Sequence, residues 1–128
     1  MKTLLWVVAQ IIAIFILLSL PGSNFQNHAQ WFGDFPMDKL VHIALFGSLA
    51  FSLFVHFEKT KIIALQSVRA KAMVLLFCVL YGIGMEFYQE YFVPSRGFEV
   101  SDMLADAVGS LLALPFFYWT RKFQNKPI

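Results

Sequence analysis

Residues that could carry chemistry occur in three polar pairs, each at a spacing that places both members on one face of a helix. The pairs are Asp38 with His42, Glu86 with Gln89, and Asp102 with Asp106. Carboxylates beside an imidazole are the groups used in general acid–base catalysis and in binding divalent cations. Asp102 also suits a helix start, where a carboxylate caps the free backbone N–H groups.

Two basic residues accompany these pairs. Lys39 follows Asp38 directly, and Arg96 lies in the short turn between Gln89 and Asp102. Arginine binds phosphate through two parallel hydrogen bonds, and lysine binds it as a point charge. Basic groups next to acidic ones therefore also suit a phosphate-containing or hydroxyl-bearing headgroup.

The elements that must position these residues are long apolar runs. Of the 128 residues, 59% are apolar and 14% are charged, whereas a soluble domain has about 45–50% and about 25%. Because the runs are continuous and not alternating, they predict membrane-spanning helices instead of barrel strands. We therefore expect one all-α domain over residues 1–128, with an uncleaved first span and four transmembrane helices. The expected spans are about 4–20, 40–57, 72–93 and 103–120.

Depth in the membrane brings the polar pairs to one level. Glu86 lies eight residues before Pro94, or roughly 12 Å below the interface at helical rise, and Asp106 lies about one turn below Asp102. His42 lies about one turn inside the second span. Ionisable groups within a span cost free energy unless they face other helices or water. We therefore expect one polar cluster formed by Asp38, Lys39, His42, Glu86, Gln89, Arg96, Asp102 and Asp106.

The distribution of basic residues predicts the orientation of the chain. Eight lie on one side of the expected spans and two, Lys39 and Arg96, lie on the other. Since short cytoplasmic segments are enriched in lysine and arginine, both termini are predicted to be cytoplasmic and connectors 21–38 and 94–101 to face outward. The eight are Lys2, Lys59, Lys61, Arg69, Lys71, Arg121, Lys122 and Lys126.

In this order, the polar motifs resemble those of the VanZ-like family of small bacterial integral membrane proteins. The matching pieces, within residues 38–112, are Asp38-Lys39-x-x-His42, Glu86-x-x-Gln89, Pro94-x-Arg96 and Asp102-x-x-x-Asp106-x-x-Gly109. The family usually has Asn where this chain has Asp106. The resemblance implies a multi-pass protein of the bacterial cytoplasmic membrane and cell envelope, associated with sensitivity to teicoplanin-type glycopeptides. It supplies no catalytic residues.

The sequence leaves several functions open. The expected function is binding of an outer-leaflet lipid, such as a lipid-linked envelope precursor, through the polar cluster. The alternatives are an intramembrane acid–base or metal-assisted hydrolase, a purely structural polar network in an assembly protein, and a transporter. Membrane lipids are the expected partners, a homo-oligomer is left open, and neither nucleic acid nor a cofactor is expected. Gly82, Gly84 and Gly109 are expected to allow close helix packing.

Overall fold

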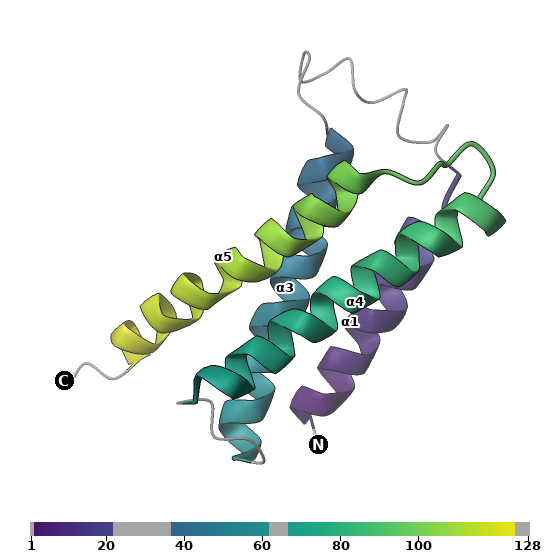
Figure 1. Cartoon of the computed structure of the whole chain (residues 1–128). Coiled ribbons are helices and arrows are strands. Elements are labelled where there is room, and N and C mark those ends of the chain that lie inside the picture. Colours follow the sequence, from purple (N-terminus) through teal and green to yellow (C-terminus); the bar gives the residue numbers. More distant parts are fainter. Residues whose placement is uncertain (1, 22–36, 62–66, 125–128) are drawn as a thin grey trace.

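The computed structural model describes residues 2–21, 37–61 and 67–124 of the chain, and within these ranges it is all-helical. Four helices follow one another in alternating directions (Figure 1). They are α1 (Lys2–Leu18), α3 (Met37–Thr60), α4 (Val68–Phe92) and α5 (Val100–Gln124). Residues 22–36 of the first predicted connector, and Lys126 among the basic residues, lie outside the described residues.

Three of these helices are long and apolar enough to cross a membrane, namely α3, α4 and α5. The all-α prediction is thus confirmed for the described ranges. α1 has 17 residues and is shorter than the other three, so the count of four spans remains a prediction. α3 and α5 begin three residues before the expected spans, because polar first turns that include Asp38 and Asp102 extend the apolar segments. α4 begins at Val68, where the Ser67 side chain accepts a hydrogen bond from the Ala70 N–H at 3.1 Å.

The closest helix packing joins α3 to α5, and two glycines make it possible. A Cβ built at Gly109 would overlap the backbone of Ile43, with the Ile43 Cα only 2.8 Å away. On the facing helix, a Cβ at Gly47 would lie 3.0 Å from the Gly109 carbonyl oxygen. These small residues let the two backbones approach each other directly, as is common between membrane helices.

α4 uses only one of its two glycines in this way. A Cβ at Gly82 would lie 3.1 Å from both Cβ and Cγ of Asp106 on α5, so Gly82 makes room for that side chain. At Gly84 an added Cβ meets nothing within 4 Å among the described residues. Gly84 therefore makes no close helix contact within the described part of the chain. Two residues along a helix turn the backbone by about 200°, which points Gly84 away from the interface.

α1 completes the bundle by packing on α3 and α4. Its Ile14 and Leu18 are buried together with Phe46, Phe54 and other core residues. Two side chains of α4 bind its backbone: Tyr81 donates to the Ile11 carbonyl at 2.8 Å, and Gln89 donates to the Leu18 carbonyl at 2.9 Å. Many large apolar side chains on the outer helix faces stay exposed, which suits contact with acyl chains.

Candidate functional site

The predicted polar residues gather at one end of the bundle, which we call the polar end. It is formed by the first turns of α3 and α5 and the last turns of α4 (Figure 1). Five of the eight are buried, namely His42, Glu86, Gln89, Asp102 and Asp106. Asp38, Lys39 and Arg96 are partly exposed and lie closer to the tip of the polar end.

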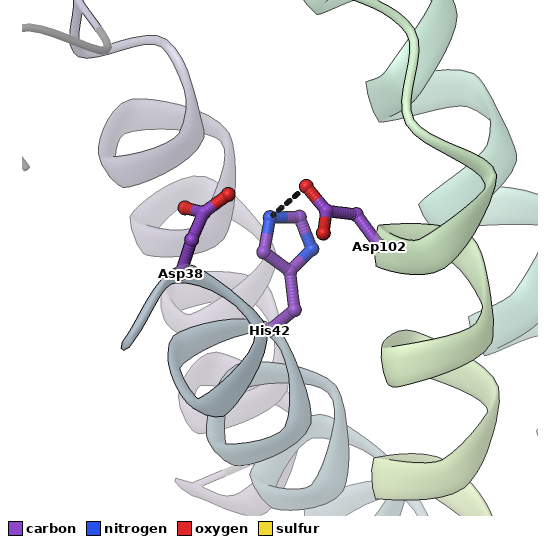
Figure 2. A group of neighbouring side chains, drawn as sticks. All are labelled: Asp38, His42 and Asp102. Carbon is purple, nitrogen blue, oxygen red and sulfur yellow. Dashed lines mark ion pairs between the residues drawn. The ribbon is translucent and has the colours of Figure 1, made fainter. Parts of the chain in front are cut away.

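The imidazole of His42 is the centre of the arrangement and is completely buried. Its Nδ1 lies 2.9 Å from Oδ1 of Asp106, and its Nε2 lies 3.7 Å from Oδ2 of Asp102. Figure 2 shows the ring between the carboxylates of Asp38 and Asp102. Asp38 lies one helical turn before His42 on α3, and the contact between α3 and α5 adds Asp102 and Asp106. Three acidic side chains therefore surround one histidine.

An outer layer of ion pairs covers this centre. Lys39 Nζ lies 2.9 Å from Oδ1 of Asp102 and 3.1 Å from Oε2 of Glu99, while Arg96 donates to Oδ1 of Asp38 at 3.1 Å. Sequence reasoning missed Glu99. Its position three residues before Asp102, directly before the start of α5, was the available signal.

Glu86 connects α4 to the start of α5. Its Oε2 accepts a hydrogen bond from the Glu99 backbone N–H at 3.0 Å, just before the first turn of α5. Glu86 lies one turn from Gly82, against which the Asp106 carboxylate packs. Gln89 is different, because its amide donates to the end of α1 and ties the two helices together.

A family model described as VanZ/LLP1 matches residues 3–121. The chain belongs to the VanZ/LLP1 family. Searches of curated proteins and of solved structures returned no match. The matched range contains all four described helices almost completely, so the polar end lies inside the VanZ/LLP1 region.

Several buried polar atoms of this VanZ/LLP1 chain have no hydrogen-bond partner among the described residues. They are His42 Nε2, Glu86 Oε1 and Asp106 Oδ2 at the polar end, and Gln10 Oε1 in α1. A buried polar atom without a partner costs about 1–3 kcal/mol. The three atoms at the polar end can therefore accept hydrogen bonds from a bound group or from water.

Proposed function

We propose that this VanZ/LLP1 protein binds an outer-leaflet lipid, with the headgroup at the polar network and an acyl chain in a groove beneath it. The observation that carries the proposal is the continuity of the two surfaces. A groove of about 420 Å³ runs along α3 and α5. Ile43 in its lining follows His42 directly, and Gly109 lies one turn below Asp106.

The lining of the groove suits an acyl chain. Its walls are almost entirely apolar, and its floor lies where the backbones at Gly47 and Gly109 approach each other. The one hydroxyl, on Ser48, already donates to the Leu45 carbonyl at 2.8 Å. The lining residues are Ile43, Ala44, Gly47, Ser48, Phe51, Gly109, Leu112, Ala113 and Phe116.

The charges at the polar end favour particular headgroups. Both basic residues of the network are already bound to carboxylates, so its remaining capacity is mainly hydrogen-bond acceptance. Sugar or peptide groups with hydroxyl and amide donors meet that capacity, as does a phosphate that brings its own cation. A lipid-linked envelope precursor carries these groups. Its binding would change how a glycopeptide reaches its target, the role that the family resemblance implies.

Lipid copurification tests the proposal. The chain is expressed in bacteria, purified in mild detergent and examined by native mass spectrometry for bound lipid. Ser48→Phe adds a ring to the groove, whereas Leu76→Phe adds bulk to an exposed lipid-facing position of α4 as a matched control. We expect at least a fivefold loss of bound lipid in the first variant and none in the second. Equal lipid content in wild type and Ser48→Phe would contradict the groove.

The same expression strains test the glycopeptide role. The teicoplanin concentration that inhibits growth is measured in a Gram-positive host with wild type, Ser48→Phe or Leu76→Phe. We expect wild type and Leu76→Phe to raise it and Ser48→Phe to leave it at the empty-vector value. No difference between wild type and empty vector would contradict this role but leave lipid binding to be judged by copurification.

We also propose that the protein crosses the bacterial cytoplasmic membrane four times with both termini inside. Supporting this, α3 ends and α4 begins at the end of the bundle opposite the polar end, where α1 also begins and α5 also ends (Figure 1). Lys59, Arg69 and Lys122 lie near these helix ends. In a Cys78→Ser background, the substitutions Lys61→Cys and Gly97→Cys distinguish the two sides of the membrane. An impermeant thiol reagent should label only position 97 in intact cells.

A further inference from the structure

We propose that the polar end contains a binding site for one divalent transition-metal ion of the Zn²⁺ type, held by Asp38, His42 and Asp102. One ligand atom from each of these side chains lies within 4.8 Å of the other two. Figure 2 shows the imidazole between the two carboxylates. Asp38 and His42 come from one face of α3, and Asp102 comes from the first turn of α5.

The hydrogen bonding of His42 prepares its other nitrogen for a metal. Nδ1 lies 2.9 Å from the Asp106 carboxylate, which as an anion accepts a hydrogen bond from the protonated Nδ1. The neutral ring then presents a lone pair on Nε2, which is completely buried and has no hydrogen-bond partner. In many metal sites, a carboxylate accepts the N–H of the metal-binding histidine and so fixes its tautomer. Asp106 fills that role here.

The distance across the gap matches an ion. Nε2 lies 3.7 Å from Oδ2 of Asp102, too far for a hydrogen bond. Two acceptors facing each other repel unless a proton or a cation lies between them. An ion about 2.1 Å from each atom spans that gap at an angle of about 120°, which is near tetrahedral. Asp38 lies in the first turn of α3, so a rotation of its side chain would bring its carboxylate oxygen to the same ion.

The charges of the network also favour a cation. Five carboxylates (Asp38, Glu86, Glu99, Asp102 and Asp106) lie with two basic side chains, Lys39 and Arg96. The formal excess is three negative charges when His42 is neutral. A divalent ion offsets more of this excess than a proton on His42 does. Lys39 and Arg96 each bind the Oδ1 of one proposed ligand, which orients the carboxylates toward the ion.

The donor set selects the type of ion. One imidazole nitrogen and two carboxylate oxygens suit Zn²⁺ better than Ca²⁺ or Mg²⁺, which prefer six or more oxygen ligands. Three protein ligands leave a fourth position open. The Asp38 side chain is 30% exposed, so an ion can reach the site from the tip of the polar end.

This inference rests on the proposed function in one respect: the open position is where a lipid phosphate would bind. It departs from the expectation of no cofactor. Ion binding is measured in detergent freed of lipid, so its failure is separate from a failure of lipid copurification. Lipid bound without an ion, or an ion bound without lipid, would each refute one proposal and leave the other.

The experiment uses the full chain in detergent, stripped with a chelator and titrated with Co²⁺. We expect one equivalent to bind with visible absorption bands typical of low coordination, and Zn²⁺ to displace it. In the Co²⁺ form, the exchangeable proton on His42 Nδ1 should give a strongly shifted proton NMR signal, because it lies on a metal-bound ring. A chain that takes up less than half an equivalent of either ion, or lacks the shifted signal, overturns the proposal.

Variants locate the ion. Asp38→Asn and Asp102→Asn each remove a ligand charge with little change of shape, and we expect Co²⁺ affinity to fall at least tenfold. Glu99→Gln is the matched control, since Glu99 binds the same lysine but is not a ligand, and we expect a change below threefold. Equal affinities in all three variants overturn the site. Should either aspartate variant fail to fold, the wild-type NMR signal decides alone.

Discussion

Exchanging single glycines for alanine tests the helix contact on which the whole site depends. Gly109 is buried against α3, whereas Gly84 lies exposed on α4, and both are inside helices. Alanine is favoured over glycine in a helix by about 1 kcal/mol. Both variants have this gain. The difference between their free energies of unfolding therefore measures the cost of separating α3 from α5.

The structure indicates how far the free energies of unfolding of Gly109→Ala and Gly84→Ala should differ. At Gly109 the new Cβ overlaps the backbone of Ile43, which has no rotamer to change, so the helices must separate. Overpacking of this kind costs about 1–3 kcal/mol, and separation also lengthens the His42–Asp106 hydrogen bond, worth about 1.5–3 kcal/mol when charged. We expect Gly109→Ala to lose roughly 2 kcal/mol after the helix gain, and Gly84→Ala to gain up to about 1 kcal/mol.

Reversible unfolding in mixed micelles measures the change in the free energy of unfolding for both variants. The two variants and wild type are titrated with SDS and followed by far-UV circular dichroism, with the free energy of unfolding extrapolated to zero SDS. A difference of about 3 kcal/mol corresponds to more than a hundredfold change in the ratio of folded to unfolded chain. Stabilities of Gly109→Ala and Gly84→Ala within 0.5 kcal/mol of each other would refute the close contact.

The remaining predictions concern buried polar groups. Asp106→Asn should change the free energy of unfolding by less than about 1 kcal/mol, because the amide oxygen still accepts from His42. Asp106→Leu should lose about 1–3 kcal/mol, because it leaves the buried N–H of His42 without an acceptor. The same SDS titration measures both. Tyr81→Phe removes the hydrogen bond to Ile11 and should cost about 0.5–1.5 kcal/mol, and an unchanged value would show that this bond does not hold α1. Cys78 is fully buried, so a thiol reagent should react with it only in SDS concentrations that unfold the chain; rapid reaction in mild detergent would contradict its burial.

Much of the architecture follows from local sequence. Continuous apolar runs predict helices, and spacings of three or four predict which polar residues share a face. These rules placed Asp38 with His42 and Asp102 with Asp106 correctly on their helices. The same rules place these four residues at a similar depth in the membrane, because the helix rise converts residue number to depth.

The spacing of residues along one helix could not predict which residues of two different helices contact each other. α3 and α5 are separated by all of α4, and nothing local states that Gly47 lies on Gly109 or that Lys39 binds Glu99. From their residue types alone, Lys39 and Arg96 could bind either a phosphate or the carboxylates of the cluster. In the fold, each binds a carboxylate.

Asp106 shows how a single residue connects stability with binding. The family resemblance leads us to expect Asn at this position, and an Asn would accept the same hydrogen bond from His42. The aspartate therefore adds little to geometry and mainly adds negative charge beside a buried imidazole. That charge makes Nε2 a stronger electron donor toward Asp38 and Asp102, where the ligand atoms converge. A chain selected for stability alone has no need of this charge, because its burial without a cation is unfavourable. The ion proposed at Asp38, His42 and Asp102 would offset this charge.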